Sequence, residues 1–351
     1  MLAPLIHILP LATVVRQRVL PIPGTVHARL NQKVVPTEVV AQGTWAREHL
    51  MIDVAGILHI APSAADRVIR CQTGDRLPEG AEVAVGGGLF PRRIHTPREG
   101  RVVTVGGGQI LLETGESPIQ LRAGMPGTVI ELIRDRGVVI QNAGSLIQGI
   151  WGNGRIDTGV LVNLAEKPDA VLSAGRLDVA QRGAMILAGR AEDAEFLQAA
   201  AELPVRGLIL SSLSPALIPL AGQMRYPILV TDGLGSLPMN SLAYRLLSTN
   251  VQREVTLNAE AYDRYTGARP EVFIPLPVSQ EPATPRDVEE FAQGQIVRMR
   301  RPPAMGAIGS IMALRTGQTL LPSGLHAPAA DVKLESGETV LVPLVNLEVV
   351  G

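Results

Sequence analysis

Turn residues divide the first part of the chain into short segments. From Arg18 to about Gly154, runs of valine, isoleucine and leucine alternate with turns that contain glycine or proline, at intervals of roughly ten residues. The runs 127–133 and 137–141 are typical, because they are β-branched, too short for helices and bounded by turn residues. We therefore expect residues 1–157 to form a β-rich region.

Some of these turns are repeated. The sequence Pro-Gly-Thr-Val at 23–26 returns at 126–129, and Val-Gly-Gly-Gly occurs at 85–88 and again at 105–108. With these repeats the region resembles the barrel-sandwich hybrid folds, which are the flattened β-barrels of biotinyl and lipoyl carrier domains. The repeats leave open whether residues 1–157 form one barrel or two. A carrier domain holds its cofactor on a hairpin lysine, but Lys33 lacks the expected neighbours, so we expect no attached cofactor.

The periodicity changes after about residue 158. Buried strands alternate there with helices of good intrinsic propensity, which predicts a βαβαβ unit with a small parallel sheet. The expected elements are strands at 182–189, 205–210 and 226–231, helices at 191–203, 214–224 and 240–247, and an edge strand at 253–258. We expect residues 158–268 to form a three-layer α/β domain.

Five prolines between 269 and 285 predict an extended, semi-rigid linker. After this linker we expect a small five-stranded β-barrel over 286–351. Within this barrel, 294–314 resembles the KOW motif: a glycine, alternating apolar residues, a turn with proline and glycine, and the pair Gly306 and Gly309. The resemblance implies a docking module that contacts RNA polymerase, the ribosome or RNA. Any five-stranded barrel with a glycine bend would have a similar pattern.

Basic residues gather in the first half of this segment. Residues 294–330 contain no acidic residue but four arginines: Arg298, Arg300, Arg301 and Arg315. Four arginines on one face could contact several phosphates and give a salt-dependent affinity, so they are the candidate residues for docking or RNA contact. The alternative is an ordinary solvated strand and turn.

A second candidate site follows the last strand of the βαβαβ unit. Open parallel sheets bind ligands at the carboxyl ends of their strands, and the segment after that strand contains Asp232, Gly233, Gly235 and Ser236. The glycines could bring backbone N–H groups close to a small anion at the start of the next helix. An ordinary connecting turn would use the same residues.

Composition excludes several classes of function. The net charge of −1 leaves no overall field for nucleic acid or an anionic membrane, and aromatic residues make up only 3% of the chain. The single cysteine, Cys71, excludes an internal disulfide and a cysteine-based zinc site, and the six histidines lack metal-ligand spacing. No apolar stretch is long enough for a membrane span. We expect a cytoplasmic protein with no metal, no cofactor and no membrane contact.

These patterns contain no catalytic constellation. They favour a non-enzymatic multidomain adaptor or scaffold that docks through the KOW-like barrel onto a larger assembly, such as the transcription or translation machinery. The competing hypothesis is a small-anion-binding or catalytic α/β domain with accessory β-modules, and a third is a self-assembling structural protein. The sequence leaves the ligand, the partner and the oligomeric state open.

Overall fold

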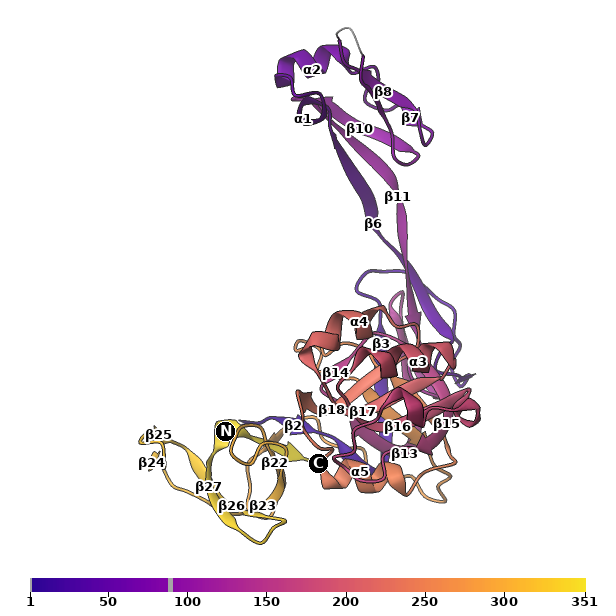
Figure 1. Cartoon of the computed structure of the whole chain (residues 1–351). Helices are drawn as coiled ribbons and strands as arrows, with labels where there is room; N and C mark the ends of the chain where they lie inside the picture. The colour runs from indigo at the N-terminus through magenta and orange to yellow at the C-terminus, as the bar shows by residue number, and fades with distance from the viewer. Residues whose placement is uncertain (1, 88–90) are drawn as a thin grey trace.

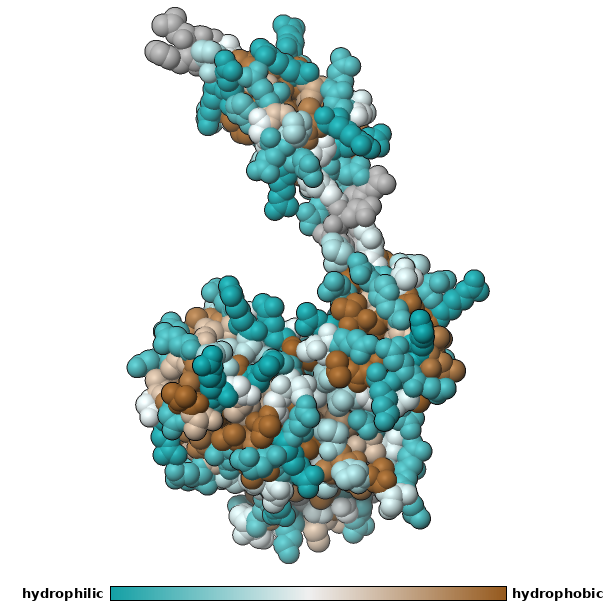
Figure 2. All heavy atoms as spheres, turned by 90° about the vertical axis from the view of Figure 1, so that its right-hand side faces the viewer, coloured by the Kyte–Doolittle hydropathy of each residue, from teal (hydrophilic) through white to brown (hydrophobic). Residues whose placement is uncertain are grey.

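The molecule has two lobes joined by a narrow neck (Figures 1 and 2). The computed structural model describes residues 2–87 and 91–351, without the side chains of 45–47 and 116–117. It is β-rich and contains several sheets, as the short apolar runs between turn residues predict. We call the larger lobe the body and residues 49–113 the distal module.

A two-stranded ribbon forms the neck. Strands β6 (Val39–Asp53) and β11 (Gln109–Arg122) pair antiparallel along almost their whole length. Strand β4 (Thr25–Val26) joins the ribbon at the body, whereas β10 (Gly100–Gly106) and β7 (Arg76–Leu77) join it in the distal module. We call the part of the ribbon between these ends the stalk.

The distal module has a hydrophobic core of its own. Val83, Val102, Ile110 and Leu112 are fully buried in it, and Cys71 lies beside them as a small core residue. The core is covered by four further elements: helices α1 (Val54–Leu58) and α2 (Pro62–Val68) and strands β8 (Glu82–Val85) and β9 (Arg93–His95). Because this core is separate from those of the body, the module is an independent packing unit inserted into the first β-rich region.

An eleven-stranded sheet is the centre of the body. Ten of its strands follow one another in the order β14 (Trp151–Gly152), β18 (Ile228–Leu234), β17 (Gly207–Leu213), β16 (Ala184–Ala191), β15 (Ile156–Asn163), β19 (Glu254–Asn258), β20 (Glu271–Pro275), β13 (Gly137–Gln148), β12 (Gly127–Ile133) and β5 (Lys33–Val34). The eleventh, β3 (Ile8–Val19), pairs with β13. Strands β15 to β18 are parallel and adjacent in chain order, as βαβ connections require, whereas the neighbouring strands are antiparallel.

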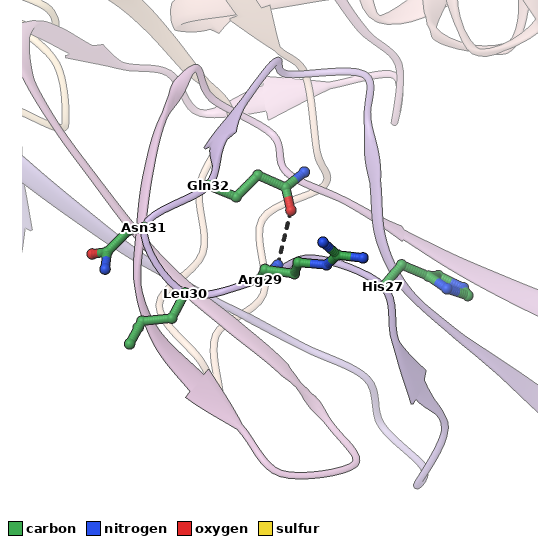
Figure 3. Close-up of a pocket in the computed structure, with 5 residues that line it drawn as sticks. All are labelled: His27, Arg29, Leu30, Asn31 and Gln32. Carbon is green, nitrogen blue, oxygen red and sulfur yellow. Dashed lines mark hydrogen bonds between the residues drawn. The ribbon is translucent and has the colours of Figure 1, made fainter.

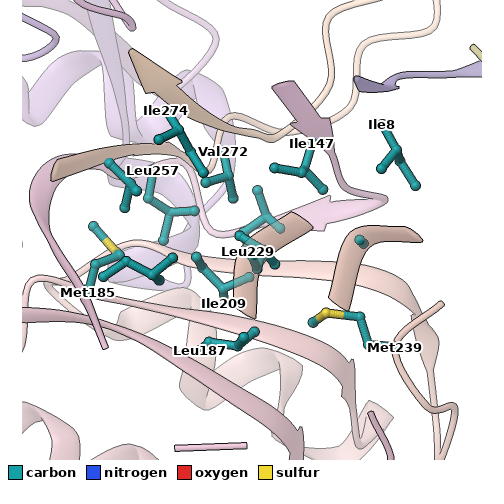
Figure 4. Close-up of a cluster of buried hydrophobic side chains, with 14 of the residues drawn as sticks. Ile8, Ile147, Met185, Leu187, Ile209, Leu229, Met239, Leu257, Val272 and Ile274 are labelled. Carbon is teal, nitrogen blue, oxygen red and sulfur yellow. The ribbon is translucent and has the colours of Figure 1, made fainter. Parts of the chain in front are cut away.

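Helices cover both faces of the parallel strands. Helices α3 (Ala194–Glu202) and α4 (Ile218–Gln223) pack on one face, and α5 (Ser241–Ser248) packs on the other. Successive strand residues alternate between the two cores: Ile186 and Leu208 face α3 and α4, whereas Leu187 and Ile209 face α5. Figure 4 shows Leu187 and Ile209 within the second of these cores. Both faces are therefore apolar, which explains the continuous hydrophobic runs in the sequence.

Single-turn 3₁₀ helices complete the connections of this sheet. They are η1 (Ala174–Arg176), η2 (Val179–Gln181) and η3 (Pro215–Leu217), the last of which leads directly into α4. The expected helix at 214–224 is thus divided into two short pieces. Pro215 and Pro219 each lack a backbone N–H, which favours starting a helical turn over continuing one.

The C-terminal sheet has six strands and includes the N-terminus of the chain. Its order is β2 (Leu5–Ile6), β28 (Leu347–Val350), β22 (Ile296–Met299), β23 (Ile308–Leu314), β26 (Ala329–Leu334) and β27 (Thr339–Pro343). The pairings of the described residues leave this sheet open, so the closed five-stranded barrel expected over 286–351 is not confirmed. Sequence periodicity could not predict the pairing of β2, because its partner lies at the other end of the chain.

Short pairs and a last 3₁₀ turn surround the C-terminal sheet. Strand β1 (Leu2–Ala3) pairs with β21 (Glu289–Glu290), and β24 (Thr319–Leu320) pairs with β25 (His326–Ala327). The turn η4 (Leu344–Asn346) connects β27 to β28. Figure 1 shows the β24–β25 hairpin projecting from this end of the body.

The proline-rich stretch 269–285 is not a simple linker. Its residues 271–275 form β20, which lies between β19 and β13 and buries Val272, Phe273 and Ile274 completely or almost completely. Strand β19, expected at an edge, is consequently inside the sheet. The prolines concealed this strand because Pro270 and Pro275 stand at its ends, where a missing N–H can be tolerated.

Candidate functional site

The carboxyl end of β18 contains a buried carboxylate. The side chain of Asp232 is fully buried, and the Thr231 hydroxyl lies 2.7 Å from Asp232 Oδ2. Asn240 donates to Asp232 twice, from its backbone N–H to Oδ2 (3.1 Å) and from Nδ2 to Oδ1 (2.9 Å). Asn240 is also the N-cap of α5, where its Oδ1 accepts from the Ala243 N–H. Asp232 therefore holds the start of α5 against the end of β18.

Arg298 reaches this carboxylate from β22 of the C-terminal sheet. Its Nη1 lies 3.2 Å from Asp232 Oδ1 and donates to the Thr231 carbonyl at 3.1 Å. Its Nη2 and Nε both donate to Glu348 Oε2, at 2.6 and 3.2 Å. Arg298 thus bridges two carboxylates that come from different sheets.

A second arginine completes this network. Arg269 Nη2 lies 3.5 Å from Glu348 Oε1, and the Arg269 guanidinium stacks over the Tyr262 ring at 5.0 Å. Two arginines and two carboxylates balance formally, so the buried charge is compensated. Burial acts to lower the pKa of Arg298, but the adjacent Glu348 and Asp232 carboxylates outweigh it and raise this pKa. We call Asp232, Arg269, Arg298 and Glu348 the junction network.

The junction network occupies the place where a ligand was expected. Asp232 was proposed to bind a small anion and Arg298 to contact a partner or RNA, yet the structure brings the two side chains into contact with each other. Both are almost completely buried, with side-chain exposures of 0% and 5%. Each satisfies the charge of the other, which fixes the C-terminal sheet on the carboxyl edge of the parallel strands.

The neighbouring loop is likewise held by internal contacts. The Gly235 N–H donates to the Leu213 carbonyl at 2.9 Å, and the Ser236 carbonyl accepts from Arg190 Nη1 at 3.2 Å. Gly235 has a φ of +119°, and a Cβ on Gly233 would overlap the Leu237 side chain. Glycine at position 235 permits this positive φ, and glycine at position 233 leaves room for the Leu237 side chain.

The other three candidate arginines do not form one basic face. Arg300 and Arg301 are exposed and directly follow β22, beside the start of β23. Arg315 follows the end of β23 and pairs with Asp331, with 2.8 Å between Nε and Oδ2. The seven residues of β23 separate these two positions by about 20 Å. Only Arg300 and Arg301 remain together as an exposed basic pair.

Two further ion pairs join the N-terminal strand β3 to the rest of the body. Arg16 Nη2 lies 2.7 Å from Glu271 Oε2, and Arg18 Nη2 lies 2.5 Å from Glu260 Oε1. Burial acts to lower the pKa of Arg16, but Glu271 outweighs it and raises this pKa. Glu260 shows the complementary case: burial acts to raise its pKa, but the hydrogen bond and charge of Arg18 lower it.

Sequence reasoning missed most of these partners, although a signal was present. Glu348, Arg298 and Glu271 each interrupt an otherwise apolar strand. A charge at such a position must be paired when the strand is buried. The pattern indicates that a partner exists but cannot identify it, because Arg298 and Glu348 are 50 positions apart.

The described part of the chain also has a shallow depression near the stalk, whose side chains do not converge on one point. This depression of about 560 Å³ is lined by His27, Arg29, Leu30, Asn31 and Gln32. In Figure 3 the Gln32 side chain turns back to accept from the Arg29 N–H at 2.8 Å, whereas the other side chains point in different directions. Burial raises the pKa of the Cys71 thiol, which disfavours the reactive thiolate.

Within residues 2–87 and 91–351, no group of three or more histidine, cysteine, aspartate or glutamate side chains could hold a metal ion. No helix in this part of the chain is long and apolar enough to cross a membrane. No family model matches the chain, and no curated protein matches it.

Proposed function

We propose that this protein is a non-enzymatic adaptor whose body carries the distal module at the end of the stalk and docks onto a larger assembly. The observation that carries the proposal is the position of the distal module (Figure 1). Strands β6 and β11 contain 15 and 14 residues, so the ribbon spans about 50 Å. A module on such a ribbon can contact a partner that the body does not touch.

The stalk is costly as a purely structural feature. A two-stranded ribbon is marginally stable in water, because both of its edges and both of its faces are open. Packing the distal module against the body would bury more apolar surface and would need no stalk. An extended arrangement is therefore best explained by a partner that binds the module away from the body.

The body is held together by several ion pairs between its parts, as a rigid support for the stalk requires. The junction network and the pairs Arg16–Glu271 and Arg18–Glu260 link the N-terminal strand, the central sheet and the C-terminal sheet. Breaking a buried pair by removing one partner is strongly destabilising, so these links oppose separation of the sheets. We infer that the body acts as one rigid support for the stalk.

The C-terminal sheet is the second proposed docking element. Its segment 294–314 resembles the KOW motif, whose family contacts RNA polymerase, the ribosome or RNA, and Arg300 and Arg301 are exposed beside β23. We propose the transcription or translation machinery as the larger assembly. The alternative function, a small-anion site at 232–236, has less support because Asp232 already has Arg298 as its cation.

Affinity capture followed by mass spectrometry tests this proposal. The bait proteins are the full chain, an excision variant in which Asn-Gly joins His49 to Glu113, and Arg300→Glu/Arg301→Glu. The excision is geometrically possible because His49 and Glu113 are paired across the ribbon, and Asn-Gly favours a two-residue hairpin turn. Truncation of the C-terminal sheet is a poorer choice, since it would leave Asp232 buried without Arg298.

The proposal expects the excision variant to lose at least one partner that the full chain captures. The charge-reversal variant tests the second docking element separately. Identical partner lists for the full chain and the excision variant would contradict the adaptor function of the distal module. Circular dichroism and gel filtration establish that each bait is folded before capture.

A further inference from the structure

A groove lies where the distal module meets the stalk. It has a volume of about 620 Å³ and is open to solvent. Its lining comes from β7, β10, β11 and the adjoining loops, and comprises Arg76, Leu77, Pro78, Glu99, Gly100, Arg101, Glu113, Thr114 and Gly115. Four of these lining residues, Arg76, Glu99, Arg101 and Glu113, have charged side chains.

Strand register places a row of charged and polar residues across this sheet. Arg76 is opposite Arg101, Arg101 is opposite Glu113, and Glu113 is opposite His49. Directly opposed residues point to the same face of an antiparallel sheet. The other face carries the core of the distal module, including Val102 and Leu112. The charged row therefore lies on the outer face, where a partner can reach it.

The opposition of Arg76 and Arg101 is unfavourable in isolation. Cβ atoms of directly opposed residues are about 4.5–5.5 Å apart, and like charges at this distance destabilise the strand pair. Both arginines are exposed, and no ion pair joins either guanidinium to a carboxylate within the described part of the chain. An anion between the two guanidinium groups would remove this repulsion and could accept hydrogen bonds from both.

The surrounding residues narrow the chemistry of that anion. Glu99 and Glu113 also line the groove, so a polyanion such as RNA would meet repulsion beside the two arginines. Pro78 supplies an apolar contact, and a Cβ placed on Gly115 would meet no atom within 4 Å. The pattern of charges is complementary to a segment with an acidic centre and basic flanks.

We propose that this groove binds an extended segment of a protein partner through a carboxylate held between Arg76 and Arg101. The inference rests on the proposed function, since it names the chemistry by which the distal module recognises its partner. In the bound state the carboxylate oxygens accept from the two guanidinium groups, while cationic residues of the segment lie beside Glu99 and Glu113. The arginine pair is then retained for binding at some cost to the stability of the free module.

This cost can be measured without a partner. Amide hydrogen exchange of 74–77 and 100–104 in the full chain should slow in Arg76→Gln, because the repulsion across β7 and β10 is removed. It should also slow in the wild type when salt screens the two charges. Arg67→Gln is the matched control, since Arg67 is an exposed arginine of α2 outside the groove. Faster exchange in Arg76→Gln would overturn the inference, because it would show that Arg76 stabilises the free module.

Binding is tested with a synthetic peptide that has two central glutamates and a lysine at each end. The full chain should bind it more tightly than the same peptide with glutamines at the centre, and Arg76→Glu/Arg101→Glu should weaken binding by about tenfold or more. Arg67→Glu should leave the affinity unchanged. Equal binding of both peptides, or preferential binding of a short uridine oligonucleotide, would overturn the proposal.

The outcome can be separated from that of the adaptor function. If excision of the distal module abolishes capture of a partner but Arg76→Glu/Arg101→Glu does not, the groove is the wrong surface while the adaptor function stands. If neither change affects any partner, both proposals fail. If both changes abolish capture of the same partner, the groove is its binding surface.

Discussion

Arg298 Nη1 lies 3.2 Å from Asp232 Oδ1, although the two residues are 66 positions apart and belong to different sheets. Each of these residues could have bound a ligand, but they bind each other and so join the two sheets. Asp232 stands where parallel sheets commonly place a ligand, at the carboxyl end of a strand. In this protein the C-terminal sheet supplies the cation for that position.

Removal of Arg298 should therefore be strongly destabilising. We expect Arg298→Met to lower the free energy of unfolding by about 3–5 kcal/mol, because it leaves Asp232 and Glu348 buried with one shared cation fewer. Arg298→Lys should be intermediate, since an ammonium cannot bridge both carboxylates as the guanidinium does. Urea denaturation measures these changes. The control Arg301→Met should shift stability by no more than about 0.5 kcal/mol, and an equal loss in both variants would contradict the joint.

Stability should depend on pH through His7. Burial lowers the pKa of His7 below 6.5, although the nearby Arg286 carbonyl, 3.1 Å from Nε2, opposes this shift. The unfolded chain therefore binds a proton near pH 6.5 that the folded chain takes up only at lower pH. The stability gained by keeping His7 neutral in the folded state is present above the pKa of the unfolded chain. It is lost as the pH falls through the folded pKa. Urea midpoints between about pH 7 and pH 5 should fall less in His7→Gln than in the wild type.

A second dependence should appear in acid. Arg18 lowers the pKa of Glu260 below 4.5 despite partial burial, so the stabilising contribution is present above that pH. It is lost as the pH falls through the folded pKa of Glu260, because the folded state must then bind a proton. We expect Glu260→Gln to flatten the acid limb of the stability profile. Glu254→Gln, at an exposed position, should leave that limb unchanged.

Excision of the distal module should leave the body intact. The core of the module shares no buried residue with the cores of the body, so joining His49 to Glu113 removes this packing unit whole and opens no cavity in the others. Differential scanning calorimetry of the variant should show the unfolding transition of the body at the wild-type temperature. A large downward shift would show that the module stabilises the body.

The local sequence pattern predicted those strands and helices whose formation depends mainly on neighbouring residues in the chain. The strand expected at 182–189 corresponds to β16, and the helix expected at 191–203 corresponds to α3, whose N-cap Asp193 accepts from the Phe196 N–H. Buried parallel strands have continuous apolar runs, and the helices between them have clear starts. These signals need no knowledge of the rest of the chain.

Long-range pairing could not be predicted in the same way. Strand β20 lies in a proline-rich stretch, and its place inside the sheet depends on β19 and β13. The stalk depends on the pairing of Val39 with Arg122, which are 83 positions apart in the chain, and the whole distal module lies between them. The contact of Asp232 with Arg298 follows from the arrangement of sheets. Periodicity and composition indicate which face of a single strand or helix is apolar. They do not indicate which strands and helices pair or pack with one another, and these features depend on that.

The most direct test of the adaptor function compares the proteins captured by the full chain and by the excision variant at equal amounts of folded bait. We expect at least one protein enriched by the full chain to fall to background with the variant, while the body still unfolds at the same temperature. Unchanged capture by a correctly folded variant would contradict the claim that the stalk serves to present the distal module to a partner.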